Sequence, residues 1–122
     1  MNSHVHNYII QGTKQWVEFR FKQEVCPSSI SLTFQGGFAA KCCQALLKPT
    51  SKSDLPVEFD AVYPQDLNNS QEFKLVASAS EAARIGGTRL RLTLSQQADF
   101  YGRVILYSVQ VKGTIATAVH ST

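Results

Sequence analysis

The side chains that could do acid–base or nucleophilic chemistry are few in this chain and are not grouped. The histidines His4, His6 and His120 all lie close to the ends of the chain, whereas a general base needs a rigid setting and a partner that orients it. The acidic residues lie in different segments, so no pair is set at the spacing of an acid–base couple. The sequence contains no G-x-S-x-G, no phosphate-binding loop and no H-E-x-x-H. The residues therefore predict a protein that is not an enzyme.

Three cysteines raise the question of a metal site or a disulfide. Cys42 and Cys43 are adjacent and Cys26 lies apart, but a zinc site needs a second pair of ligands at fixed spacing. His4 and His6 form only a weak chelator close to a solvated chain end. We expect free thiols, no metal and no cofactor. The odd cysteine count, the lack of a secretory leader and the lack of an apolar run of membrane-span length favour a protein of the nucleus or cytoplasm.

The most distinctive stretch is a polar loop that carries two aromatics and leads into a long strand. Within Asp99-Phe100-Tyr101-Gly102-Arg103, Phe100 and Tyr101 stand beside a glycine that permits a tight turn. The aromatics either pack against the rim of the domain or form a contact surface, and rim packing is slightly favoured. Arg103 either pairs with Asp99 across the turn, a contact worth about 1 kcal/mol or less when exposed, or contacts a ligand.

Alternation of apolar and polar residues predicts six strands to position this loop, at 15–21, 29–34, 55–63, 71–76, 88–94 and 103–112. The expected inward faces are Val17, Phe19 and Phe21; Ile30, Leu32 and Phe34; Val57, Phe59, Ala61 and Tyr63; Phe73 and Leu75; Leu90, Leu92 and Leu94; and Ile105, Tyr107, Val109 and Val111. Trp16 is also expected in the core. Turns are expected at 26–28, 35–37, 64–70 and 86–87, with positive φ at the glycine pairs. Residues 77–84 would form at most a short helix, and 116–122 are expected to fray.

Length and composition predict one all-β domain covering residues 1–122, with an ordered core of about 13–114. A chain of 122 residues can build a single core, and 43% hydrophobic content is typical of a folded protein. Short strands between such turns favour a sandwich or a barrel. The net charge of +3 is small and the basic residues are scattered, so we expect no direct nucleic-acid partner and no membrane partner.

Three segments together resemble a small nuclear-receptor-associated protein family. They are Phe34-Gln35-Gly36-Gly37-Phe38, Val62-Tyr63-Pro64-Gln65-Asp66-Leu67-Asn68-Asn69-Ser70, and Asp99-Phe100-Tyr101-Gly102-Arg103-Val104-Ile105-Leu106-Tyr107 with its continuation to Val111-Lys112-Gly113. The resemblance runs from about Gln15 to Gly113. It implies a galactose-binding-like (discoidin, or coagulation-factor C-type) jelly-roll sandwich. The animal member of the family is described as a repressor partner of a testicular orphan nuclear receptor.

Two departures from the family pattern limit what the resemblance implies. The chain starts almost directly at the Trp-Val strand, so the sandwich is expected to lack its first strand and the acidic loop that holds calcium in discoidin folds. An uncovered edge of this kind invites pairing with a second copy of the chain. The region from Ala39 to Asp54 also differs, so any specificity that resides there would not carry over.

The resemblance and the loop residues together indicate a set of binding candidates. In sugar-binding relatives of the fold, an aromatic in the loop before the last strand stacks on the ligand, and Phe100 and Tyr101 occupy that loop. The candidate residues for ligand or partner binding are Gln35, Phe38, Lys41, Gln96, Gln97, Phe100, Tyr101 and Arg103. The leading hypothesis is a non-catalytic protein-interaction module that binds a nuclear receptor and represses its transcriptional activity. The alternatives are a carbohydrate-binding module on the same fold and a docking subunit of a larger assembly.

Overall fold

The structure is a computed structural model that describes residues 2–6, 16–49, 57–75 and 86–115. These residues form an all-β domain whose strands pair only in antiparallel fashion. The strands are β1 (Asn2–His6), β2 (Trp16–Phe34), β3 (Ala40–Pro49), β4 (Val57–Val62), β5 (Gln71–Lys74), β6 (Gly87–Gln97) and β7 (Leu106–Ile115). The all-β prediction is therefore confirmed. The expectations for 77–84 and 116–122, and for the side chains of Val57 and Phe59, lie outside the described residues.

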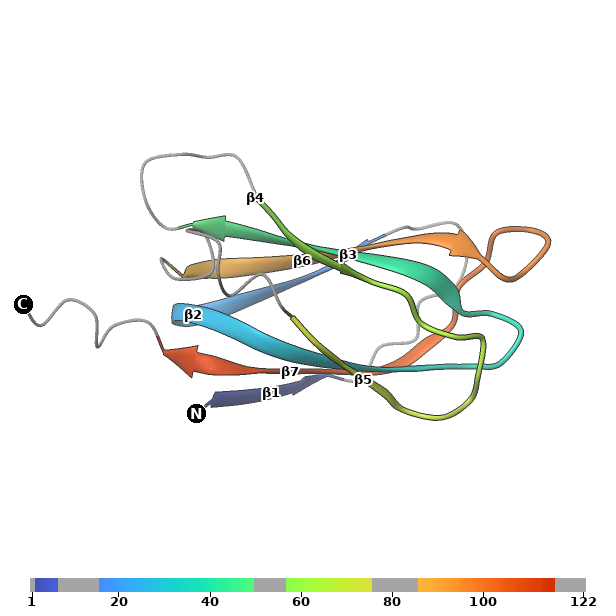
Figure 1. Cartoon of the computed structure of the whole chain (residues 1–122), viewed down its shortest axis with the longest axis horizontal. Coiled ribbons are helices and arrows are strands. Elements are labelled where there is room, and N and C mark those ends of the chain that lie inside the picture. The colour runs from blue at the N-terminus through green and yellow to red at the C-terminus, as the bar shows by residue number, and fades with distance from the viewer. Residues whose placement is uncertain (1, 7–15, 50–56, 76–85, 116–122) are drawn as a thin grey trace, which may run out of the picture.

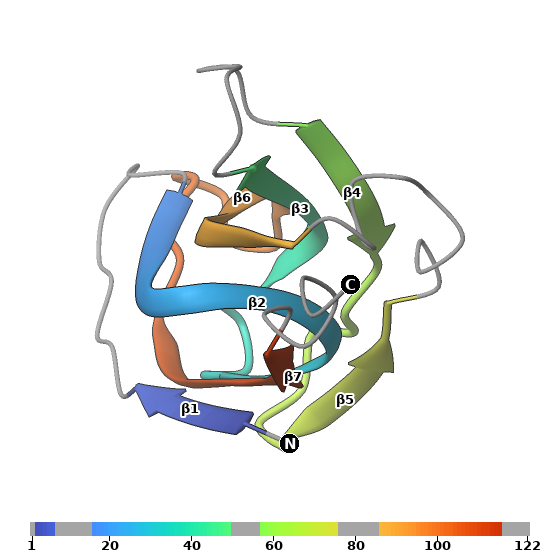
Figure 2. The ribbon, with the colours of Figure 1, turned by 90° about the vertical axis from the view of Figure 1, so that its left-hand side faces the viewer.

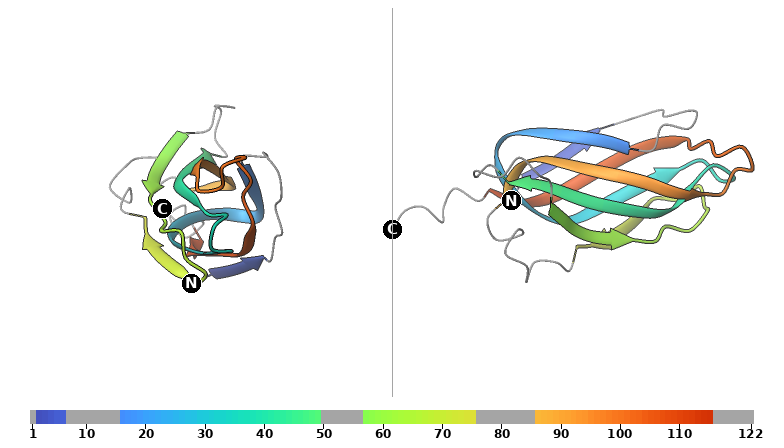
Figure 3. Two further views of the ribbon diagram at one scale, coloured as in Figure 1. Left: turned by 90° about the vertical axis from the view of Figure 1, so that its right-hand side faces the viewer. Right: turned by 90° about the horizontal axis from the view of Figure 1, so that it is seen from above.

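The strands follow one another around a nearly closed ring, in the order β1-β7-β2-β6-β3-β4, with β5 paired to β2 (Figure 2). Strand β2 joins the two halves of the ring. Its first part, from Trp16, pairs with β6, and its second part, ending at Phe34, pairs with β7. The result is an elongated barrel-like domain (Figures 1 and 3). None of the described segments forms a helix of the length and apolarity needed to cross a bilayer.

The core fills the ring with side chains that the alternation pattern identified. The fully buried members include Phe19, Ile30, Leu32, Phe34, Leu90, Leu92, Leu94, Val109 and Val111. Alternate residues of β2 and β6 point inward because a pleated strand presents every second side chain to the same face. The inward faces predicted for 15–21, 29–34 and 88–94 are confirmed.

The turn predicted at 26–28 is wrong. Cys26, Pro27 and Ser28 lie within β2, which runs unbroken for 19 residues. The pairing of β2 with β7 shifts by one residue at Ser28, between Pro27 and Ser29, so the proline lies at a bulge, where a missing backbone N–H is tolerated. Ser28 lies at this shift, and its carbonyl accepts a hydrogen bond from the Leu75 amide at 2.8 Å. The bulge therefore replaces the turn and lets one strand serve both halves of the domain.

Two strands were missed. Strand β3 was not predicted because Ala40, Cys42, Cys43 and Ala45 are all buried small side chains, so the segment shows no clean alternation of large apolar and polar residues. Strand β1 pairs with β7 from Asn2↔Gly113 to His6↔Val109. The expectation of a sheet with no strand ahead of Trp16 is therefore wrong, since β1 covers one side of β7.

Three predicted face assignments are also corrected. A register shift between Thr33 and Phe34 leaves Tyr107 as an extra residue of β7, so Tyr107 is exposed and Leu106 is buried. The β3–β4 ladder has a similar register shift, between Ala45 and Leu46. Beyond it, Val62 is buried and Tyr63 is exposed, the reverse of the predicted faces. A bulge reverses the faces downstream of it, which simple alternation does not foresee. Trp16 is on the outer face of β2, 38% exposed, and not in the core.

Candidate functional site: a loop end with exposed aromatics

Three loops gather at one end of the domain, and we call residues 35–39, 63–70 and 98–105 the loop end. Strands β2, β4 and β6 finish there and β3, β5 and β7 begin there, so the antiparallel pairing brings the loops together (Figure 1). All three segments that carry the family resemblance contribute to this end. The loops between strands are the usual position for binding residues held by a rigid scaffold.

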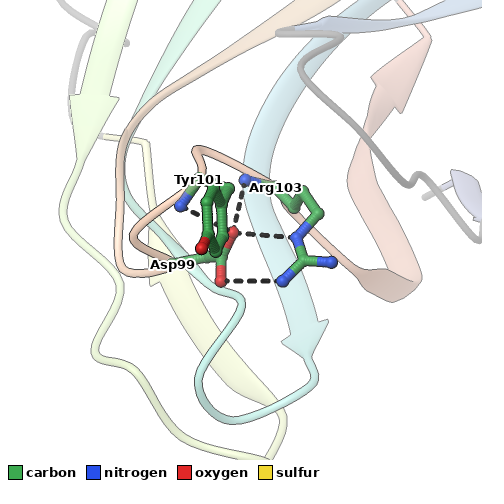
Figure 4. Close-up of polar contacts among 3 residues, drawn as sticks. All are labelled: Asp99, Tyr101 and Arg103. Atoms are coloured by element: carbon green, nitrogen blue, oxygen red, sulfur yellow. Dashed lines mark hydrogen bonds and ion pairs between the residues drawn. The ribbon is translucent and has the colours of Figure 1, made fainter.

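Asp99 organises the turn that precedes β7 (Figure 4). Its Oδ2 accepts hydrogen bonds from the backbone N–H groups of Tyr101 and Arg103, both at 3.1 Å, and from Arg103 Nε at 3.0 Å. Its Oδ1 accepts from Arg103 Nη2 at 3.3 Å. The Gly102 N–H donates to the Asp99 carbonyl at 3.0 Å, and Gly102 has φ +77°. Of the two alternatives for Arg103, pairing with Asp99 across the turn is the one that the structure shows.

The Asp99–Arg103 pair also fixes the charge state of the turn. The side-chain hydrogen bonds from the Arg103 guanidinium hold the pKa of the Asp99 carboxyl below its ordinary value, with the Tyr101 and Arg103 amides adding to the effect. Asp99 in turn raises the pKa of Arg103. Both groups are charged near neutral pH, and each neutralises the other, so the turn presents little net charge to a partner.

Phe100 and Tyr101 project from this turn into solvent. Phe100 is 91% exposed and Tyr101 71% exposed, so the slightly favoured prediction of rim packing is wrong. The two rings meet edge to face, with centroids 5.2 Å apart and planes at 88°, an arrangement that aromatic pairs prefer. The guanidinium carbon of Arg103 lies 5.5 Å from the Tyr101 ring and 5.3 Å from the Phe38 ring. The two rings are therefore exposed side by side on a hydrogen-bonded turn.

The 35–39 loop is tied to the base of this turn. The Gln35 N–H donates to the Ile105 carbonyl and the Ile105 N–H donates to the Phe38 carbonyl, each at 3.0 Å. The Tyr107 hydroxyl donates to Gln35 Oε1. Gly37 has φ +89° and Gly36 does not have a positive φ, so the positive φ predicted for this glycine pair is confirmed at Gly37 alone. Gln35 is thus held against Ile105 and Tyr107, and Phe38 lies beside Arg103.

Two side chains of the 63–70 loop hold it against the 35–39 loop by accepting hydrogen bonds from backbone amides of that loop. Asp66 Oδ1 accepts from the amides of Gly37 at 2.8 Å and Ala39 at 3.3 Å. Asn68 Oδ1 accepts from the Gly36 N–H at 2.6 Å. The Gln65 N–H donates a hydrogen bond to Gln71 Oε1, and Gln71 Nε2 donates one to the Gln65 carbonyl, both at 2.8 Å. These contacts order a loop that carries exposed Tyr63 and Leu67, 65% and 40% exposed.

The remaining predicted site residues lie at the base of the loop end. Ala40 pairs with Gln97 and Cys42 with Ser95, so Lys41 and Gln96 occupy facing positions on β3 and β6. The Ala98 N–H donates a hydrogen bond to the Ala39 carbonyl at 2.9 Å. This bond extends the β3–β6 pairing to the start of residues 99–103, which we call the aromatic turn. Gln96 has φ +56°, which is costly for a residue with a side chain.

Sequence reasoning missed several residues that build or extend the surface: Tyr63, Asp66, Leu67, Asn68 and Tyr107. Asp and Asn within a loop rich in turn residues are the signal that could have identified the two loop-bracing side chains, because both residue types bond to nearby backbone amides. Tyr63 and Tyr107 had been assigned inward by alternation. Their exposure depends on bulges that the sequence pattern does not reveal.

Cys26, Cys42 and Cys43 are thiols outside any disulfide, as expected. Burial raises the pKa of Cys43 to about 12, with neighbouring Cys42 adding to the shift, so this thiol stays neutral near pH 7 and is a poor nucleophile. Among residues 2–6, 16–49, 57–75 and 86–115, no group of three or more His, Cys, Asp or Glu side chains could hold a metal ion.

The comparisons with known proteins decide the family. No family model matches the chain. The chain is 34% identical over 104 residues to nuclear receptor 2C2-associated protein of Homo sapiens, covering 84% of this chain and 68% of that protein. The proteins of the same name from Bos taurus and Xenopus tropicalis are 33% and 35% identical over 103 residues. The chain belongs to this family.

The family membership agrees with the resemblance that the three loop segments predicted. The matches cover 84% of this chain and about two thirds of each relative, 67% for the Bos taurus protein and 69% for the Xenopus tropicalis protein. The relatives' name states that they associate with a nuclear receptor, which is consistent with a role in protein interaction.

Proposed function

We propose that this protein is a non-catalytic interaction module that binds a nuclear receptor through its loop end and represses the receptor's transcriptional activity. The observation that carries the proposal is the aromatic pair Phe100 and Tyr101, which is held in a fixed turn and left almost fully exposed. The relatives' association with nuclear receptor 2C2 supplies the class of partner.

The physical case rests on preorganisation. Aromatic side chains are enriched among the residues that dominate binding energy at protein interfaces. Phe100 and Tyr101 bring large apolar area with few rotatable bonds, and the hydrogen bonds to Asp99 have already fixed the backbone beneath them. Binding therefore loses little conformational entropy. Tyr63 and Leu67, exposed on the neighbouring 63–70 loop, can extend the same apolar surface.

Two further assignments belong to this proposal. We assign the fold to the discoidin type of jelly roll, supported by the antiparallel ring of strands, the bridging β2 and the loops gathered at one end. The site of action is the nucleus or the cytoplasm, where a nuclear receptor resides.

A binding and reporter experiment tests the function. Purified protein is mixed with purified nuclear receptor 2C2 and the mixture is analysed by co-precipitation, while the same variants are expressed beside a receptor-driven reporter gene. We expect the wild type to be retained and to lower reporter output, and we expect the double variant F100A/Y101A to lose both properties. The matched control is Ile115→Ala, because Ile115 is an exposed apolar residue at the far end of β7. Retention of F100A/Y101A at wild-type level would overturn the proposal.

The carbohydrate-binding alternative stays a prediction. Exposed aromatics at a loop end suit stacking on a sugar as well as on a protein, so an NMR titration with simple sugars separates the two. Shifts of the Gln96 to Arg103 amides in the presence of sugar, together with no retention by the receptor, would favour the carbohydrate reading. The docking-subunit alternative is distinguished by the size at which the protein elutes from cell lysate.

A further inference from the structure

A row of positive side chains crosses the outer face of the β2–β6–β3 sheet. Arg20 stands directly opposite Arg89 in the β2–β6 ladder, and Lys48 stands directly opposite Arg89 in the β3–β6 ladder. We call these three residues the cationic row. Their chain neighbours Phe19, Leu47 and Leu90 are buried in the core, so the row belongs to the face that points away from the core.

Negative charge reaches the cationic row at Arg20, through Glu18. Among the carboxylates whose side chains the structure describes, which leaves out Glu58 on β4, none forms an ion pair with Arg89 or Lys48. Glu18 contacts Arg20 at 3.6 Å and Arg91 at 3.8 Å, so one carboxylate is shared by two arginines. Like charges directly opposite each other on neighbouring strands are destabilising. The sheet therefore carries an arrangement that costs stability and that an anionic partner would relieve.

The chemistry around the row distinguishes between anionic partners. The adjacent row of the sheet contains Glu18, Arg91 and Leu46 and continues to the backbone position of Glu58 on β4. The Arg91 guanidinium also stacks 4.2 Å from the centroid of the Trp16 ring. Adjacent strands are about 4.8 Å apart, so the cationic row is only about 10 Å long. A nucleic-acid backbone needs a longer basic track than this row provides. A short peptide that mixes acidic and apolar side chains fits, since the apolar side chains meet Trp16 and Leu46.

We propose that the outer face of β2, β6 and β3, centred on Arg89, is a docking surface for an acidic peptide segment of a partner protein. This surface is separate from the loop end. Arg89 lies near the start of β6, and the aromatic turn follows Gln97 at the other end of that strand, about 26 Å away at 3.3 Å per residue. The two surfaces can be occupied at the same time.

The test measures fluorescence anisotropy with a fluorescein-labelled ten-residue peptide in which glutamate alternates with leucine. We expect the full chain to bind this probe, and Arg89→Gln to weaken the affinity about fivefold, the value for one exposed ion pair of about 1 kcal/mol. Lys74→Gln removes the same charge from exposed Lys74 on β5 and is expected to leave the affinity unchanged. A probe with glutamine in place of glutamate is expected not to bind.

A second readout shows that the Arg89→Gln variant folds. Because this substitution removes the like-charge contacts to Arg20 and Lys48, its Tm is expected to equal or exceed that of the wild type. The proposal is overturned if the wild type does not bind the glutamate probe, if Arg89→Gln and Lys74→Gln have equal effects, or if a single-stranded oligonucleotide of the same length binds more tightly than the peptide.

Discussion

One carboxylate determines how the aromatic pair is presented. Asp99 accepts hydrogen bonds from two backbone amides and from the Arg103 side chain, so one side chain braces the whole turn. The Phe100 ring makes its edge-to-face contact with Tyr101 on this turn. Loss of the negative charge on Asp99 would weaken every one of these hydrogen bonds at once.

The turn should therefore loosen in acid. Arg103 holds the pKa of Asp99 below its ordinary value of 3.8, so the ionised carboxylate stabilises the folded turn above that value and the contribution is lost as the pH falls through the lowered pKa. We expect the amide resonances of Tyr101 and Arg103 to shift together below about pH 4. Asp99→Asn should remove this titration. A titration of these amides that persists in Asp99→Asn would contradict the assignment to Asp99.

Gly102 tests the backbone of the same turn. Its φ of +77° is a conformation that a residue with a side chain rarely adopts, although a methyl group there would meet nothing within 4 Å. Gly102→Ala should therefore cost about 1 kcal/mol of unfolding free energy through backbone strain alone, measured by urea denaturation. Phe100→Ala removes a side chain that is 91% exposed, so it should change the free energy of unfolding by less than about 0.5 kcal/mol. Equal stability of the two variants would contradict the strained turn.

At the level of the strands, two ladders depend on glycines at points of close contact. A Cβ on Gly113 would lie 2.4 Å from the Cys26 carbonyl oxygen, and a Cβ on Gly87 would lie 2.4 Å from the Lys48 carbonyl oxygen. Both obstacles are backbone atoms of a neighbouring strand and cannot rotate away. These glycines are therefore needed where β2 meets β7 and where β3 meets β6.

Gly113→Ala and Gly87→Ala should each destabilise the protein by about 1–3 kcal/mol, the usual cost of overpacking. Chemical denaturation followed by circular dichroism measures the effect. The matched control is Thr114→Ala, because Thr114 is exposed and adjacent to Gly113 in β7, and it should change stability by less than about 0.5 kcal/mol. A Gly113→Ala protein as stable as Thr114→Ala would show that the ladders open easily.

The strands that could be predicted are those with regular alternation of large side chains, such as β6 with Leu90, Leu92 and Leu94. The same reasoning failed at β3, where small buried residues carry no periodic signal, and at Tyr107, where a bulge reverses the faces. The candidate site was predictable in location because its loops have distinctive residues. The exposure of Phe100 and Tyr101 was not, since it depends on Asp99 and Arg103 satisfying each other within the turn.

At the level of the whole molecule, β2 makes the domain a single cooperative unit. Its two parts belong to the β6 and β7 sides of the ring, so neither side can unfold while the other keeps a complete sheet. We expect urea unfolding to be two-state, with coincident transitions from far-ultraviolet circular dichroism and from the fluorescence of Trp16, the only tryptophan. Two separated transitions would contradict the shared strand.

The affinity for nuclear receptor 2C2, measured by isothermal titration calorimetry, tests the central claim most directly. If the loop end is the binding surface, F100A/Y101A should raise Kd by at least about thirtyfold, the value for a loss of 2 kcal/mol from an aromatic centre of binding, while Ile115→Ala leaves Kd unchanged. A Kd for F100A/Y101A equal to that of the wild type, in a protein that remains folded, would contradict the account.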